Sequence, residues 1–494
     1  MESSRTHISN RPVSGASAGL VMVPLRHFIN DPQIKTLKPA GIYYLFAHSK
    51  PALRVLPMQH TSLNLKIIII GAGIGGLTAA IALRQQGHEV EVYERSRLAS
   101  EVGAAIHVAP NFTVILNRLG IFPEEFGGTA YQGLALKHAS AEPKYNVSVG
   151  EGRKHWQAEY WLVHRVDLHA ALKEKATSPS GLGIPVTLHR AAAVADVDCT
   201  RATVTLADGS TASADVVLAA DGVHSVARNI VTGGAYGTRT SGKCCYRWLM
   251  PHAVLEDDAE IRELVGEPGL VTEVAGADRR IVFYPCKDGQ LMNCAAFVPV
   301  EEVGVIQKGE ERKSCHGRFD DVVLTLRAGW NSSGNKEKLL RSFEGFAPQV
   351  LRMLEKAPED HVAVWDLVDM DVLPTWINGR VALLGDAAHP FLPYMGQGAA
   401  QAIEDAAALG ALLPIGTAPE DIPRRLQLYE QCRKERADFV QDFTRQRGRD
   451  GGRGQSEVAS VLQKCISHNA WEHAVRVLQG DAGQETGFHP EARI

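Results

Sequence analysis

The chain has 494 residues, of which 45% are hydrophobic and 22% are charged, so it can bury a large core and form two or three domains. Its 52 Lys and Arg against 56 Asp and Glu give a formal net charge of −4 with no strongly basic block, which argues against nucleic acid or an anionic membrane surface as a partner. No uninterrupted apolar stretch approaches the ~20 residues that span a bilayer, so stable membrane insertion is not expected.

The eight cysteines are scattered, without a C-x-x-C pair or a grouping with histidine that resembles a metal site. This pattern is typical of free thiols in a reducing compartment and predicts no bound metal. The final Ala-Arg-Ile is only a distant relative of the Ser-Lys-Leu peroxisomal address, so we expect a cytoplasmic chain, with the peroxisome as the alternative.

Residues 1–62 show no sustained periodicity and mix Ser, Pro, Gly and His, which predicts a poorly ordered extension. The apolar stretch at 19–25 is too short and too interrupted by proline to be the core of a signal peptide. Met58 would be a sensible beginning for the first domain.

A strand, a glycine turn, a helix and a second strand follow one another at 66–94. The apolar run at 67–70 suits a parallel strand buried on both faces, and it leads into GAGIGG at 71–76. In this G-x-G-x-x-G pattern the first glycine permits the bend, the second lets the backbone approach a pyrophosphate, and the third lets the helix pack closely. Glu94 lies 94 − 76 = 18 residues beyond the last glycine, near the spacing of about 20 at which an acid binds a ribose hydroxyl. The segment predicts a dinucleotide site built on Gly71, Gly73, Gly76 and Glu94.

Two later buried strands also end in an acid beside a glycine. The strand at 216–220 runs into Asp221-Gly222, and the one at 378–384 runs into Gly385-Asp386. Residues 396–399 then open a helix, whose N-terminus attracts anions or electron-rich carbonyls. Arg165 precedes another helix, where its planar fork can pair with a phosphate; a surface ion pair with Asp167 is the alternative.

These motifs, in the order GxGxxG with a distal Glu, then DG, then GD, resemble the single-component flavin-dependent aromatic hydroxylases, the p-hydroxybenzoate and salicylate hydroxylase family. The resemblance spans about Leu65 to Arg445 and rests on AADGVHSVAR at 219–228 and RVALLGDAAHPFLPYMGQGAAQAIEDAAALG at 380–410. It looks most like the fungal salicylate-hydroxylase-like monooxygenases, including those that hydroxylate phenolic intermediates of secondary metabolism, with aromatic catabolism as the other implied setting. It implies an α/β fold with a Rossmann-like FAD-binding domain, an inserted, mostly antiparallel β-sheet substrate domain and C-terminal helices.

On this resemblance we divide the chain into five parts. They are the extension (1–62), a first part of the FAD-binding domain (63–245), the substrate sheet (246–361), a return to the FAD-binding domain (362–422) and a C-terminal helical region (423–494). The last part contains a Gly/Arg linker near 447–457 and a final helix over 457–478.

The resemblance also implies the cofactor contacts. Glu94, with Arg95 beside it, would bind the FAD ribose, and Arg165 would reach the pyrophosphate. Asp386 would bind the ribityl chain, and the Gly398-Ala399 backbone would contact the isoalloxazine edge. Pro390 would line the place where oxygen reacts. Asp221 would support both FAD and the pyridine nucleotide. The cofactor would also contact the segment Gly103, Ala104, Ala105, whose sequence departs slightly from the family pattern.

The implied activity is FAD-dependent monooxygenation with NAD(P)H as a transient co-substrate and O2, acting on a small phenolic or aromatic-acid molecule in a monomer or homodimer. Because only one dinucleotide fingerprint is present and the flavin occupies it, the nicotinamide would bind transiently. The alternatives are an epoxidase, a Baeyer–Villiger-like enzyme or a flavin oxidase of the same fold. A non-catalytic flavin-fold binding module and an NAD-dependent dehydrogenase explain fewer of the motifs.

The pair Tyr246-Arg247 follows the DG motif at the start of the expected substrate sheet. In our hypothesis Tyr246 holds a phenolate oxygen while Arg247 or Arg228 favours its ionisation by charge. The alternative for Tyr246 is a packed strand residue with a satisfied hydroxyl.

Overall fold

The computed structural model describes residues 64–98, 104–303, 332–333, 335–359, 361–449 and 455–480. All of them belong to one unit, residues 62–494. The extension at 1–62 and Gly103 lie outside the described residues, so the predictions made for them stay predictions.

A six-stranded sheet holds the glycine turn and the two later strand-end motifs. Its order is β19-β20-β12-β1-β2-β8, and all neighbours pair in parallel except β19 with β20. The strands are β1 (Lys66–Ile70), β2 (Glu89–Glu94), β8 (Thr187–Arg190), β12 (Val216–Ala219), β19 (Ile377–Asn378) and β20 (Val381–Leu383). Helix α1 (Ile74–Gln85) follows β1 and packs against α3 (Arg165–Thr177) and α10 (Gly398–Leu412). The predicted Rossmann-like part is confirmed.

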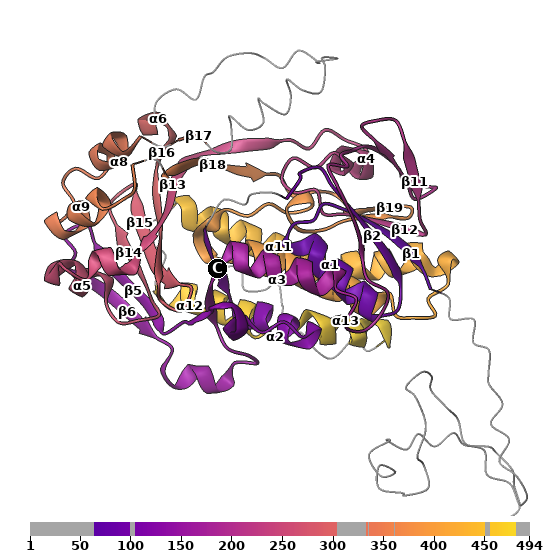
Figure 1. The fold of residues 1–494 in the computed structure, drawn as a ribbon, viewed down its shortest axis with the longest axis horizontal. Helices are drawn as coiled ribbons and strands as arrows, with labels where there is room; N and C mark the ends of the chain where they lie inside the picture. Colours follow the sequence, from indigo (N-terminus) through magenta and orange to yellow (C-terminus); the bar gives the residue numbers. More distant parts are fainter. Residues whose placement is uncertain are drawn as a thin grey trace, which may run out of the picture. The chain divides into compact units, whose positions relative to one another are not determined.

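An eight-stranded, mostly antiparallel sheet forms the second large layer (Figure 1). Its order is β17-β18-β13-β16-β15-β14-β5-β6, and only β14 with β5 pairs in parallel. The strands are β5 (Gly133–His138), β6 (Pro143–Ser148), β13 (Thr238–Pro251), β14 (Leu270–Ala275), β15 (Arg280–Cys286), β16 (Leu291–Pro299), β17 (Ser332–Ser333) and β18 (Ala363–Met370). The sheet thus takes in strands on both sides of the predicted 246–361.

The two faces of this sheet have different neighbours. Helices α5 (Ala259–Val265), α8 (Lys336–Ser342) and α9 (Pro348–Glu355) cover the outer face, on the left in Figure 1, and share one core with Tyr246 and Trp248 of β13. Because side chains alternate along a strand, Cys245 and Arg247 point to the opposite face, which lines the cavity described below.

Two smaller sheets and the remaining helices complete the described fold. The small sheets contain β3 (Ala105–Val108), β4 (Thr129–Ala130) and β7 (Trp161–His164), and β9 (Val194–Asp198), β10 (Thr203–Leu206) and β11 (Thr211–Ser213). The remaining α-helices are α2 (Pro110–Leu119), α4 (Ala227–Thr232), α6 (Val300–Val303), α11 (Ile422–Arg449), α12 (Gln455–Ile466) and α13 (Ala470–Leu478).

The C-terminal region differs from the prediction. Both described ends of the expected linker at 447–457 are helical, because α11 continues to Arg449 and α12 begins at Gln455. The single helix expected over 457–478 is two helices, since Asn469 begins a new one by accepting a hydrogen bond from the Glu472 amide at 3.2 Å. An Asn in this position is a favoured N-cap, which is the sequence feature we overlooked.

A buried ion network joins α10 to α11. Glu404 and Asp405 are fully buried, and Arg433 donates to both, to Glu404 at 2.5 Å and to Asp405 at 2.9 Å. Arg436 adds a hydrogen bond to Glu404 at 2.7 Å, and His389 bonds Asp405 at 2.6 Å. Burial alone would raise the pKa of Glu404, but Arg436 and Arg433 hold it well below its usual value. The network therefore fixes both helices against the turn that follows β20.

Arg433→Leu should destabilise the fold, because it leaves buried carboxylates without one of their cations. Breaking a buried ion pair on one side costs about 3–5 kcal/mol. With an unfolding entropy of about 2.1 cal/mol/K per residue, this corresponds to a fall in Tm of about 3–5 °C for the described unit. Differential scanning calorimetry of the purified protein checks it. The matched control is Arg424→Leu on the exposed start of the same helix, and an equal loss in both variants would contradict the role of the network.

Candidate functional site

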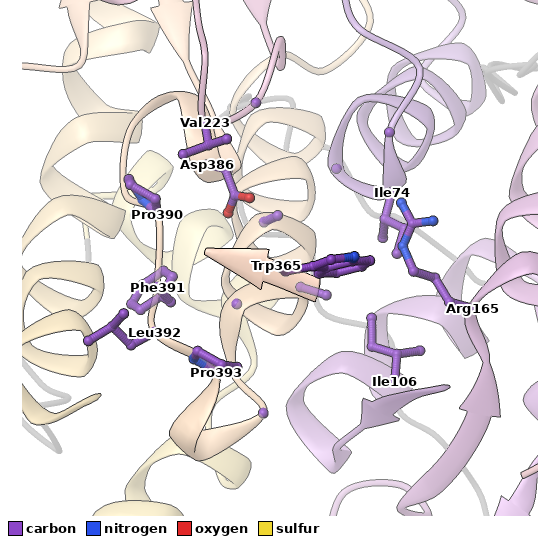
Figure 2. A pocket seen from close by; sticks show the side chains of 18 of the residues that line it. Ile74, Ile106, Arg165, Val223, Trp365, Asp386, Pro390, Phe391, Leu392 and Pro393 are labelled. Atoms are coloured by element: carbon purple, nitrogen blue, oxygen red, sulfur yellow. The ribbon is translucent and has the colours of Figure 1, made fainter. Parts of the chain in front are cut away.

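A cavity of about 960 Å³ lies between the carboxyl ends of the parallel strands and the inner face of the eight-stranded sheet. Figure 2 shows Asp386 and the loop Pro390–Pro393 on one side of it, with Arg165 and Ile74 on the other. The strand-end motifs meet here because β20, β12, β1 and β2 are neighbours that run the same way. Most of the predicted cofactor contacts line this cavity, namely Gly71, Gly73, Gly76, Glu94, Arg95, Ala105, Arg165, Asp221, Asp386, Pro390, Gly398 and Ala399.

The three motif glycines have different physical roles. A Cβ on Gly71, whose φ is +100°, would lie 2.4 Å from the Ala220 carbonyl oxygen, and one on Gly76 would lie 2.1 Å from the Gly71 carbonyl oxygen. These two positions are restricted by the protein itself. A Cβ on Gly73 would meet no protein atom within 4 Å. Gly73 therefore leaves room for a ligand beside the N-terminus of α1, which fits the phosphates of a dinucleotide.

Glu94 and Arg165 approach the same turn from different elements. Glu94 accepts hydrogen bonds from the amides of Ala72 at 2.8 Å and Ser96 at 2.7 Å, which fix its carboxylate at the end of β2. Arg165 begins α3, and the next turn of that helix places His169 Nε2 2.7 Å from the Ala72 carbonyl oxygen. Sequence reasoning missed His169, although its spacing of four from Arg165 places both on one helix face.

Asp221 has a structural role beside its place in the cavity wall. Its Oδ2 accepts hydrogen bonds from the amides of Val226 at 2.7 Å and Ala227 at 3.3 Å at the start of α4. Its Oδ1 is buried and finds no partner among the described residues. A free acceptor in the cavity wall fits a hydroxyl group of a bound cofactor.

Arg228 does not line the cavity, contrary to its predicted role beside a phenolate. It is buried and donates to the carbonyl oxygens of Val223 at 2.9 Å, Asp386 at 2.8 Å and Ala387 at 2.8 Å. Arg228 thus ties the DG motif to the GD motif and acts as a positioning residue. Arg228 was predicted to favour the ionisation of a phenol, but its N–H groups donate to backbone carbonyl oxygens instead.

Asp386 faces the cavity at the end of β20. Its side chain is accessible from the cavity, yet the protein surrounds it and burial raises its pKa above the usual value, while His389, Arg228 and Arg165 oppose that rise. A carboxyl group in this position can exchange hydrogen bonds with the hydroxyls of a ribityl chain. The N-terminus of α10 opens into the cavity at Gly398 and Ala399, so its unpaired amides are available to an electron-rich ligand edge.

The segment before β3 is only partly in the cavity wall. Ala105 lines the cavity, and its amide donates to Asn293 Oδ1 at 2.9 Å. Ala104 is buried outside the wall, where its carbonyl oxygen accepts a hydrogen bond from the Arg165 amide at 2.8 Å. The predicted role of Ala104 is therefore indirect.

Arg247 and Tyr246 lie on opposite faces of β13. Arg247 lines the cavity, stacks 4.8 Å from the ring centre of Trp365, and has a buried Nε without a partner among the described residues. Tyr246 is fully buried on the outer face, where its hydroxyl finds no partner among the described residues. Neighbouring strand residues cannot share a face, so the prediction that both contact one substrate is wrong for Tyr246.

His107 and Tyr160 were not predicted, and both line the cavity. His107 Nδ1 lies 2.9 Å from the Tyr160 hydroxyl, and its ring packs edge-on to Tyr284 with the centroids 4.6 Å apart. Burial, assisted by the charge of Arg247, lowers the pKa of His107 to about 4. His107 is therefore neutral at pH 7 and can exchange a hydrogen bond with a ligand. His107 lies in β3 and Tyr160 directly precedes β7, 53 residues later in the chain, so no local sequence pattern predicts their contact.

The sheet side of the cavity is mainly apolar. Cys245, Ala295, Phe297 and Leu367 contribute side chains from β13, β16 and β18. Burial raises the pKa of Cys245 to about 12, although Arg247 opposes this. Such a wall excludes water and suits a flat ring.

Neither a membrane helix nor a metal cluster is found in the described part of the chain. No helix there is both long and apolar enough to cross a membrane. No three His, Cys, Asp or Glu side chains in that part gather as metal ligands would.

Two family models match the segments that form the cavity's cofactor side. Residues 69–106 match the NAD(P)-binding Rossmann-like domain, and residues 350–444 match the FAD binding domain.

Known proteins of similar length also match. Hispidin-3-hydroxylase of Neonothopanus nambi is 36% identical over 76% of this chain and 87% of the relative. The FAD-dependent monooxygenase cfoG of Aspergillus candidus is 36% identical over 77% of this chain and 85% of the relative. A salicylate hydroxylase in complex with its substrate has a TM-score of 0.66 and 25% identity, covering 83% of this chain and 97% of that structure.

Gly73→Ala should reduce bound FAD without unfolding the chain, because the added Cβ has space in the protein but takes the space of the ligand. The ratio of absorbance at 450 nm to that at 280 nm in the purified protein measures the loss, and Tm of the apoprotein measures folding. Gly237→Ala is the matched control, since a Cβ there also meets nothing within 4 Å and the residue lies outside the cavity wall. A full flavin content in the Gly73 variant would contradict the assignment.

Proposed function

The chain belongs to the FAD-dependent monooxygenases, and on that premise we propose that it uses NAD(P)H and O2 to hydroxylate a phenolic or aromatic-acid small molecule. The observation that carries the proposal is the cavity itself. One end is formed by the strand-end motifs that fit FAD, and the other by an apolar sheet face that carries Arg247. Two similar proteins, a hispidin-3-hydroxylase and a salicylate hydroxylase, support an aromatic substrate.

When bound, FAD supplies the chemistry that side chains lack, the reduction of O2 and the transfer of one oxygen atom. The protein's part is to hold the cofactor and the substrate together and to exclude water. Glu94, Arg165 and Asp386 would hold the cofactor by its ribose, pyrophosphate and ribityl groups.

Arg247 would prepare the substrate. Hydroxylation of a ring by an electrophilic oxygen is favoured when a phenol oxygen ionises and pushes charge into the ring. A guanidinium beside that oxygen stabilises the anion, and each unit by which the phenol pKa falls is worth about 1.4 kcal/mol. The contact with Trp365 holds the guanidinium in the wall, while neutral His107 can accept or donate a hydrogen bond nearby.

Reduction of the enzyme-bound flavin by NAD(P)H should be slow alone and faster when a suitable phenol is present, because the aromatic ligand shares the cavity with the cofactor. Stopped-flow absorbance at 450 nm under nitrogen, over a panel of phenols and phenolic acids, tests this. Fast reduction that no phenol changes would indicate an oxidase or a reductase instead.

Arg247→Met should uncouple the reaction, so that less product and more hydrogen peroxide form per NAD(P)H while the FAD content is unchanged. Tyr246→Phe should leave coupling as it is, because the hydroxyl lies on the outer face and bonds no other described residue. Product and peroxide are measured together in both variants. Equal coupling in the wild type and the Arg247 variant would exclude Arg247 from substrate activation.

We also propose a cytoplasmic location, which fits the scattered cysteines without a C-x-x-C pair, and a monomeric or homodimeric state.

A further inference from the structure

The cavity has a second cationic end, formed by Arg280, Arg447 and Glu273, which we call the distal cluster. Arg280 Nη1 lies 3.2 Å from Glu273 Oε1, and Arg447 Nη2 lies 3.7 Å from Glu273 Oε2. The side chain of Arg280 is only 15% exposed, that of Arg447 12% and that of Glu273 11%. Two guanidinium groups face one carboxylate, so the cluster keeps an excess of one positive charge (2 − 1 = 1).

Arg447 has a donor to spare. Its Nε is buried and finds no partner among the described residues. A buried guanidinium N–H without an acceptor is costly, and in a cavity wall it indicates a ligand oxygen. Two residues earlier on α11, Arg445 donates to Asp369 of β18 at 2.9 Å, which anchors this end of the helix to the sheet. It lies beyond the segment that matches the FAD-binding model, residues 350–444.

The strand register gives the distance between the distal cluster and Arg247. Arg247 pairs with Ala295, which pairs with Val282, whereas Arg280 pairs with Phe297. Arg280 is therefore two strands away from Arg247 and two residues along, which at about 4.8 Å per strand and 3.3 Å per residue places the Cα atoms about 12 Å apart. The side chains between them, Ala295, Val282 and Phe297, are apolar and line the cavity.

We propose that the substrate is an elongated phenolic molecule with a second acidic oxygen, a carboxylate or an ionised hydroxyl, bound by Arg280 and Arg447. The ring to be hydroxylated lies at Arg247, and the apolar wall contacts the part between the two ends. This inference rests on the proposed function for the reacting ring. It adds the distal cluster as a specificity subsite, to which α11 contributes Arg447.

The test uses the FAD-loaded full chain and one pair of probes, 4-hydroxycinnamate and its methyl ester, which differ in the distal charge. Binding is followed by the change in visible flavin absorbance. The wild type should bind the acid at least about tenfold more tightly than the ester. Arg447→Met and Arg280→Met should weaken acid binding about 10- to 100-fold, the loss expected for a charge-assisted hydrogen bond, and leave ester binding unchanged. Arg424→Met, the same change on the exposed start of α11, should keep the preference.

Equal affinity of the wild type for both probes, no binding of either, or an equal loss for acid and ester in the Arg447 variant would each overturn the subsite. Retained FAD and an unchanged Tm show that the variants are folded. The two proposals fail separately. If phenols stimulate NAD(P)H oxidation but the acid and ester do not differ, only the subsite is wrong; if no phenol stimulates it, the proposed function fails as well.

Discussion

The site depends on one constraint, that neighbouring parallel strands end at the same edge of a sheet. Strands β20, β12, β1 and β2 lie in this order, and each delivers one motif to that edge. The glycine turn and Asp386 are 386 − 71 = 315 residues apart in sequence, yet they line one cavity because β20 returns beside β12. Arg228 then ties the turns after β12 and β20 together through their backbone carbonyls. A chain that paired these strands in another order would keep every motif and lose the site.

Sequence reasoning succeeded where the determinant is local. A buried strand that ends in glycines or in an acid beside a glycine can be recognised without its neighbours, and the order of three such motifs was enough to indicate the family. It failed on β13, where the neighbours Tyr246 and Arg247 were assigned to one substrate although successive side chains of a strand point to opposite faces. Only the packing of α5, α8 and α9 decides which face is the core. His107, Trp365 and Arg447 come from three separate elements, so their proximity follows from tertiary packing alone.

Helix α11 connects the core of the cofactor-binding part with the far end of the cavity. Arg433 and Arg436 hold its middle against α10, and Arg445 holds its end against β18. The same helix therefore supports the turn after β20 and aims Arg447 at the sheet. Because those contacts are buried ionic hydrogen bonds, their geometry tolerates little displacement, and the position of Arg447 is set by the fold rather than by the ligand.

The thiol of Cys245 gives the cavity wall a further property. When oxygen reduction is uncoupled from hydroxylation, a monooxygenase releases hydrogen peroxide and exposes its own interior to an oxidant. Peroxide attacks cysteine in its thiolate form. Burial raises the pKa of Cys245 to about 12, so its thiol is protonated at neutral pH. The low polarity that suits the wall to an aromatic ring therefore also keeps the Cys245 thiol in the protonated form, which peroxide attacks least.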